Sequence, residues 1–198
     1  MMLIAHRRNT IAELQATQPR YGVEVDIRSE GQRLIIHHDP FVAGESFEEW
    51  IDCYRHATLI LNVKEEGLER RLISLAAARG IADFFFLDQS FNFLVKTFRA
   101  GEHRCAARVS EFELVESALT LAGKVDWVWV DCFTQFPLTQ DAASELQSAG
   151  FKLCLASPEL HGRPAETEIP QLASLLKDRG ISADAVCTKR PDLWECVA

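Results

Sequence analysis

Long apolar runs, low-complexity segments and an excess of basic residues are all missing from this sequence. No stretch approaches the ~18 consecutive apolar residues that a membrane-spanning helix needs. The opening residues MMLIAHRRNT lack the basic-then-apolar order of a signal peptide, so we expect a cytoplasmic protein without membrane insertion. A net charge of −8 argues against a broad basic surface for nucleic acid, although a local basic pocket for one phosphate remains compatible with it.

Metal-type cysteine spacing is also absent. The six cysteines form no CxxC pair and no Cys/His ligand pattern, and four of them lie in apolar, strand-like runs. Reduced core residues are therefore expected rather than zinc ligands. The cysteines are Cys53, Cys105, Cys132, Cys154, Cys187 and Cys196.

No Gly/Ser linker or block of like charge marks a domain boundary, so the 198 residues are expected to form a single domain, 1–198. Short apolar runs rich in Val, Ile and Phe recur, and helical spacing follows each of them, as is typical of parallel βα units. The expected strands are 2–6, 22–28, 58–64, 83–88, 104–110, 126–132, 151–157 and 185–189. The run 33–38 follows the second strand so closely that it predicts a short hairpin extension.

The helical segments share a glycine at their C-terminal end, which suits a helix stop. They are 65–80, 91–101, 111–123, 139–150 and 169–180. Eight βα units predict an α/β fold, a compact (β/α)8 TIM barrel. The main alternative is a doubly wound open sheet, which normally has fewer strands and often a glycine-rich first turn. The first turn here, HRRNT, contains no glycine.

The segment GVEVDIRS carries two carboxylates within an otherwise apolar strand. Strand alternation sends Glu24 and Asp26 to the same face, where two unpaired charges would be costly to bury. A hard divalent ion, Mg²⁺ or Ca²⁺, held with a nearby amide oxygen would offset them. The alternative is an ion-pair network with Arg7, Arg28 or Lys64.

Polar residues end nearly every expected strand, at the barrel face where catalytic groups collect. His6 ends the first strand, and His37 and His38 end the hairpin in HHDP, where alternation lets only one of them face the pocket. Two imidazoles beside a carboxylate pair suit proton transfer on either side of a reacting phosphorus.

These motifs, in this order, resemble the glycerophosphodiester phosphodiesterase family and its relatives among the phosphatidylinositol-specific phospholipases C. The family's His-Arg followed by Asn, its Glu-x-Asp and its His-Asp correspond to His6, Arg7, Asn9, Glu24, Asp26 and His38. The weaker matches are LILNVK, which gives Asn62 and Lys64 for Glu-x-Lys, and CTKRPD, which gives Thr188, Lys189 and Pro191 for Thr-Asp-x-Pro.

The resemblance implies a barrel hydrolase of lipid metabolism that cleaves a small glycerophosphodiester-like substrate with Mg²⁺ or Ca²⁺. The roles it implies are His6 and His38 as general acid and base, Arg7 and Lys64 as phosphate ligands, Glu24, Asp26 and Asn62 as metal ligands, and Asp131, Glu159 and Lys189 in the substrate pocket.

Three positions depart from the family pattern. Arg8 stands where the family has Gly, and Lys189 stands where it has Asp. Asn62 replaces the third acidic ligand, which removes a negative charge and should lower metal affinity. Two other functions therefore stay open, which are binding of a phosphorylated ligand without turnover and a lyase or isomerase reaction on a sugar phosphate.

Overall fold

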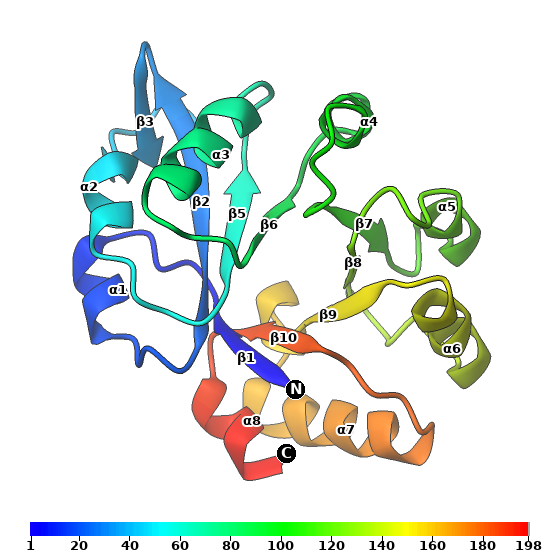
Figure 1. The fold of residues 1–198 in the computed structure, drawn as a ribbon. Coiled ribbons are helices and arrows are strands. Elements are labelled where there is room, and N and C mark those ends of the chain that lie inside the picture. Colours follow the sequence, from blue (N-terminus) through cyan, green and yellow to red (C-terminus); the bar gives the residue numbers. More distant parts are fainter. Residues whose placement is uncertain (198) are drawn as a thin grey trace. The chain divides into compact units, whose positions relative to one another are not determined.

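The computed structural model describes residues 1 to 197, in which β-strands alternate with α-helices along the chain (Figure 1). The chain divides into two compact units. His6–Cys105 form the N-terminal unit, and Met1–Ala5 together with the residues from Ala106 onward form the C-terminal unit. The predicted α/β class is confirmed. The closed barrel and the single domain stay predictions.

The long strand β2 organises the sheet of the N-terminal unit. It pairs antiparallel with β3 and parallel with β5 (Figure 1). Strand β5 also pairs parallel with β6, and β3 pairs antiparallel with β4. The strands are β2 (Gly22–Glu30), β3 (Arg33–Ile36), β4 (Glu45–Ser46), β5 (Leu59–Val63) and β6 (Phe84–Leu87). The predicted hairpin is confirmed, with Ile27 opposite Ile36. The two-residue β4 was not predicted, because so short a strand has no periodicity to detect.

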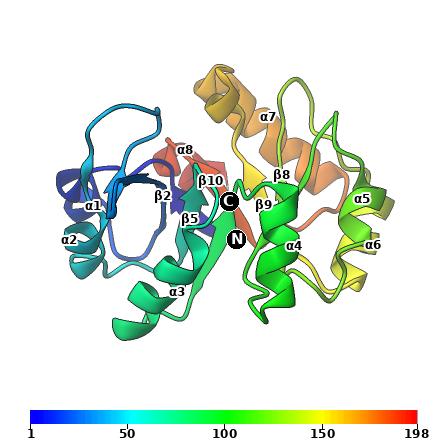
Figure 2. The ribbon, with the colours of Figure 1, turned by 90° about the horizontal axis from the view of Figure 1, so that it is seen from above.

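The helices of the N-terminal unit are α1 (Ile11–Ala16), α2 (Phe47–Asp52), α3 (Glu69–Ala78) and α4 (Phe91–Arg99). A capping box starts α1, in which Thr10 accepts from the Glu13 amide and Glu13 accepts from the Thr10 amide. Figure 2 shows α1 beside α2, and α2 buries Trp50 in the core. The Trp50 indole donates to the Arg8 carbonyl at 2.8 Å, which ties α2 to the segment that follows β1 (Met2–Ala5).

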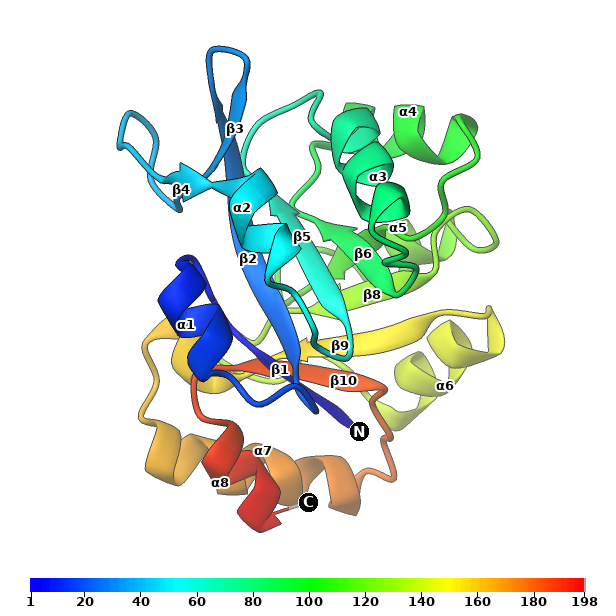
Figure 3. The same cartoon turned by 60° about the vertical axis from the view of Figure 1, so that its left-hand side comes forward.

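The C-terminal unit contains a parallel sheet in the order β1, β10, β9, β8, β7. Its strands are β1 (Met2–Ala5), β7 (Ala106–Val109), β8 (Trp127–Val130), β9 (Lys152–Ala156) and β10 (Ala185–Thr188). Its helices are α5 (Val115–Leu119), α6 (Gln140–Ser148), α7 (Ala165–Asp178) and α8 (Pro191–Val197), with a short 3₁₀ helix, η1 (Pro158–His161). Figure 3 shows α7 and α8 packed side by side.

Buried strands explain the near-continuous apolar runs of the sequence, since parallel strands covered on both faces carry apolar residues at successive positions. All five residues of β5 are buried, Asn62 included. Four cysteines are buried as expected; the prediction is wrong for half-buried Cys53 and exposed Cys196, which lie at the end of α2 and in α8 rather than in strands. No helix within residues 1 to 197 combines the length and hydropathy required to span a bilayer.

Candidate active site

Two buried carboxylates lie at the centre of the N-terminal unit. Glu24 and Asp26 are each 0% exposed on β2, and the strand register places Asn62 of β5 opposite Asp26. The Asn62 amide donates to Oε1 of Glu24 at 2.8 Å. Burial, reinforced by the charge of Asp26, raises the pKa of Glu24 to about 8. A bound proton or a nearby cation is therefore needed to stabilise this pair of buried carboxylates.

The segment after β1 folds directly onto these carboxylates. The Arg7 amide donates to Oε2 of Glu24 at 2.7 Å, and the Arg8 amide donates to the Glu24 carbonyl at 2.8 Å. Asn9 holds Asp26 at two points, donating to Oδ2 at 2.8 Å and accepting from the Asp26 amide at 3.0 Å. The sequence HRRN thus supplies donors that fix both acids.

Two cationic side chains contact Asp26. Nε of Arg7 lies 3.5 Å from Oδ2 of Asp26, and Nζ of Lys64 lies 3.2 Å from Oδ1. Lys64 also donates to Asp88 at 2.8 Å. The ion-pair interpretation is therefore confirmed for Arg7 and Lys64. It is wrong for Arg28, which donates to backbone carbonyls instead.

The two candidate histidines lie in the same unit but have different partners. Nε2 of His6 is 3.8 Å from Oε2 of Glu24. Nδ1 of His38 lies 2.8 Å from Oδ1 of Asp39, and this hydrogen bond is the main reason why the pKa of Asp39 is lowered. The ring of His37 instead contacts the backbone of Asp39. With Nδ1 engaged by a carboxylate, His38 presents Nε2 for proton exchange.

The donor set can be compared with the needs of a hard divalent ion. Oδ1 of Asp26 and Oδ1 of Asn62 are buried and accept no hydrogen bond from residues 1 to 197. Carboxylate and amide oxygens are suitable ligands for Mg²⁺ or Ca²⁺, so the residues fit such an ion in type. The set contains only two carboxylates, and the described part of the chain holds no cluster of three or more His, Cys, Asp or Glu side chains that could bind a metal.

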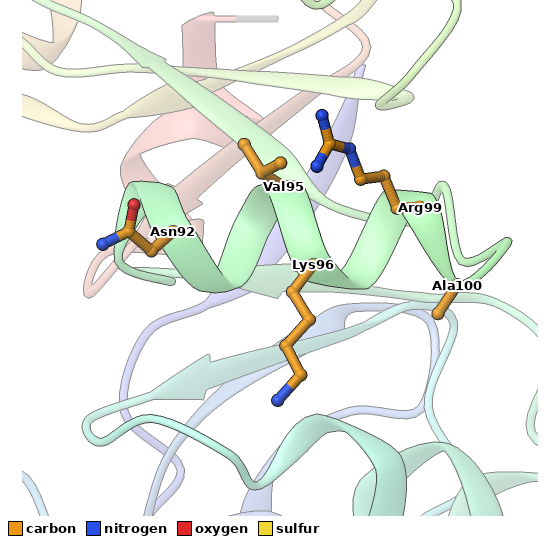
Figure 4. A pocket seen from close by; sticks show the side chains of 5 residues that line it. All are labelled: Asn92, Val95, Lys96, Arg99 and Ala100. Carbon is orange, nitrogen blue, oxygen red and sulfur yellow. The ribbon is translucent and has the colours of Figure 1, made fainter.

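A cavity of about 290 Å³ adjoins Lys64. It is lined by Val63, Lys64, Glu65, Glu66, Glu69, Asp88, Gln89 and Ser90. A larger hollow of about 540 Å³ lies along α4, where Lys96 points to the opposite side of the helix from Val95 and Arg99 (Figure 4). None of the predicted site residues borders that hollow, whereas Lys64 borders the smaller cavity.

In the C-terminal unit, the predicted pocket residue Asp131 belongs to a polar cluster after β8. It accepts a hydrogen bond from the Trp129 indole at 2.8 Å, pairs with Arg108, and lies 3.2 Å from Nε2 of His161. Asp131 is 2% exposed, and Arg108 is its cationic partner.

Of the other two predicted pocket residues, Glu159 lies in η1, which follows β9, and Lys189 directly follows β10. The Glu159 carboxylate accepts from the Thr188 hydroxyl at 2.6 Å, from the Lys189 amide at 2.8 Å and from the Ser157 hydroxyl. Glu159 therefore ties the ends of these two strands together, while the Lys189 side chain is exposed. A substrate-binding role for Asp131, Glu159 and Lys189 stays a prediction.

Three residues make contacts at the site that the sequence did not predict, namely Asn9, Arg28 and Asp88; Arg28 was expected as an ion-pair partner of the acids and not as a donor to backbone carbonyls. Asn9 lies in the motif that carries the family resemblance, and Asp88 ends a predicted strand. Arg28 follows Asp26 by two positions, so strand alternation could have placed it on the same face.

This α/β arrangement, with polar residues at the ends of buried strands, has the fold of glycerophosphodiester phosphodiesterases. The glycerophosphodiester phosphodiesterase from Agrobacterium tumefaciens superposes with a TM-score of 0.72 at 15% identity, over 99% of this chain and 98% of that one. The glycerophosphoryl diester phosphodiesterase from Parabacteroides distasonis gives 0.68 at 12%, over 99% and 85%. No protein-family model and no curated protein matches the sequence. The resemblance seen in the sequence motifs is thus confirmed for the fold.

Proposed function

We propose that this protein is a phosphoric diester hydrolase acting on a small glycerophosphodiester-like substrate. The observation that carries the proposal is the buried pair Glu24 and Asp26, contacted by Arg7 and Lys64 with His6 beside it. The expected (β/α)8 barrel is part of the proposal, because such barrels collect catalytic groups at the carboxyl ends of their strands.

Phosphate binding is assigned to Lys64 and Arg7. An ammonium has three N–H donors, and Lys64 donates one of them to Asp88 while it pairs electrostatically with Asp26, so a donor is left for a phosphate oxygen. The Arg7 guanidinium contacts Asp26 through Nε and is 41% exposed, so its outer N–H groups are available to a ligand. Fixed cationic donors stabilise the charge that develops on phosphoryl oxygens.

Glu24, Asp26 and Asn62 are proposed to hold a divalent ion, Mg²⁺ or Ca²⁺. Their oxygens suit it, and the raised pKa of Glu24 reflects a destabilised ionised form that a cation would stabilise. When bound, such an ion supplies Lewis-acid stabilisation of phosphoryl oxygens. Asn9 and the Arg7 amide keep both carboxylates oriented.

Proton transfer is assigned to His6 and His38. Diester hydrolysis needs one group to take a proton from the nucleophile and another to protonate the leaving alcohol, and imidazole does both near neutral pH. Asp39 holds the His38 ring through Nδ1, which directs exchange to Nε2.

The test is hydrolysis of a panel of glycerophosphodiesters and an aryl phosphodiester, with EDTA or with added Mg²⁺ or Ca²⁺. Metal-stimulated release of free alcohol is expected, and it would also exclude the sugar-phosphate lyase or isomerase. Folded protein with no turnover on the whole panel would refute the proposal.

A second candidate is binding of a phosphate ester without turnover. It is favoured by the neutral Asn62, whose amide donates to Glu24, and by the Lys64 ammonium beside Asp26. Stabilisation of the protein by phosphate esters but not by divalent ions, together with absent hydrolysis, would select it.

A further inference from the structure

The Arg28 side chain makes an unusual set of contacts for a cation two residues beyond Asp26. Its Nε and Nη2 donate to the His38 carbonyl at 3.1 and 2.8 Å, and its Nη1 donates to the Lys64 carbonyl at 3.3 Å. One guanidinium thus contacts the backbone of two residues that are 26 positions apart in the sequence and have separate roles in the proposed reaction.

These contacts do not serve charge neutralisation. Within residues 1 to 197, Arg28 makes no ion pair, and the cations that contact the carboxylates are Arg7 and Lys64. The planar guanidinium offers N–H donors in a fixed fork, which suits it to hold two acceptors in a defined relative position. Lysine has no such fork.

The loop that carries His38 needs this restraint. His38 follows β3 by two residues, and its side chain is 40% exposed. At the far end of the loop, Gly44 packs so closely that a Cβ there would lie 2.2 Å from the Ile36 carbonyl oxygen. Between these points the residues from Asp39 to Ala43 are exposed, so packing does little to fix His38.

We propose that Arg28 is a positioning residue that fixes the backbone of His38 relative to that of Lys64. The inference rests on the proposed function, in which His38 exchanges a proton with the substrate whose phosphate Lys64 binds. Arg28 contacts neither the His38 imidazole nor the Lys64 ammonium. It acts through the backbone carbonyls of these two residues.

The kinetic test compares Arg28→Met and Arg28→Lys with the wild-type protein on an aryl phosphodiester. Because misplacement of a catalytic group by about 1 Å can cost ~100-fold, Arg28→Met is expected to lower kcat by ~10- to 100-fold with little change in KM. Arg28→Lys should recover only part of the loss. Arg33→Met, an exposed arginine on neighbouring β3, is the matched control and should keep wild-type kcat.

A double-variant cycle separates positioning from general stability. In a His38→Gln background, Arg28→Met should cause little further loss of kcat, because the group it positions is already gone. Full, independent loss in that background would overturn the proposal.

An NMR measurement keeps the inference testable even if no hydrolysis is found. The Hε1 resonance of His38, assigned by its disappearance in His38→Gln, should shift or broaden in Arg28→Met while those of His103 and His161 stay in place. An unchanged His38 resonance would refute the positioning role. If the wild type shows no turnover but the His38 resonance shifts in Arg28→Met, the proposed function is refuted and the positioning role of Arg28 is not.

Discussion

The Lys64 ammonium lies 3.2 Å from the carboxylate of fully buried Asp26. Removing the cation leaves a buried charge without one of its partners, which is more costly than removing both. Lys64→Met should therefore lower the free energy of unfolding by about 3 kcal/mol and abolish phosphate binding. Urea unfolding and titration with a phosphate ester measure the two effects.

The double variant Lys64→Met with Asp26→Asn should recover part of the lost stability but not the binding. Lys177→Met, at an exposed lysine of α7, is the control and should leave both unchanged. Equal unfolding free energies for Lys64→Met and the control would contradict the stabilising role of the pair.

Replacing either proposed proton-transfer residue should reduce turnover without unfolding the protein. His6→Gln and His38→Gln are each expected to lower kcat by ~100-fold, the size typical of general acid–base groups. His37→Gln is a close control, because its ring contacts only the backbone of Asp39 in the described structure. Steady-state hydrolysis measures the turnover of each variant, and circular dichroism checks that it is folded. Wild-type turnover in both His6→Gln and His38→Gln would contradict their assignment as proton-transfer residues.

Asn62→Glu should tighten divalent-ion binding, because it adds a third carboxylate beside Glu24 and Asp26. Without metal the same variant should be less stable than the wild type, since a further charge is buried. Calorimetric titration with Mg²⁺ and Ca²⁺, and melting temperature with and without the ion, measure both effects. Asn92→Glu, at an exposed position of α4, is the control. A metal titration of Asn62→Glu identical to that of the wild type would place Asn62 outside the ligand set.

Stability should depend on pH through Glu24. Its pKa is raised from 4.5 to about 8, so between these values the folded protein retains a proton that the unfolded chain has lost. The unfolding free energy should therefore fall as pH rises from about 4.5 to about 8 and level off above that range. Urea midpoints from pH 5 to 9 measure the slope.

Glu24→Gln should remove this dependence, so the wild type loses stability relative to the variant as pH rises through that range. Exposed Glu116→Gln should instead run parallel to the wild type. Saturating Mg²⁺ should flatten the wild-type curve if it binds the carboxylate. Parallel curves for the wild type and Glu24→Gln would show that Glu24 does not hold the proton.

Much of the fold could be predicted from the sequence, because buried parallel strands are apolar at nearly every position. Every predicted strand, and the hairpin 33–38, overlaps a strand of the structure. The short helices α1, α2 and α8 were not identified, since six or seven residues give too little periodicity. The capping pair Thr10 and Glu13 is the sequence signal that would have indicated α1.

The candidate site was predicted in composition but not in its internal contacts. Alternation correctly placed Glu24 and Asp26 on one face. It could not reveal that Asn9 donates to the Asp26 carboxylate or that Lys64 also donates to Asp88. Nor could it reveal that Arg28 donates to backbone carbonyls. Such contacts depend on side-chain rotamers and on segments distant in the chain, which a residue pattern does not encode.

Arg7 performs two tasks that favour different amino acids. Its backbone adopts φ of +51°, which glycine would accept without strain, and this conformation accompanies the amide contact to Glu24. Its side chain contacts Asp26, which glycine could not do. Replacing Arg7 with glycine would therefore relieve the backbone strain and at the same time remove a cation from buried Asp26, so two contributions to conformational stability oppose each other at a single residue.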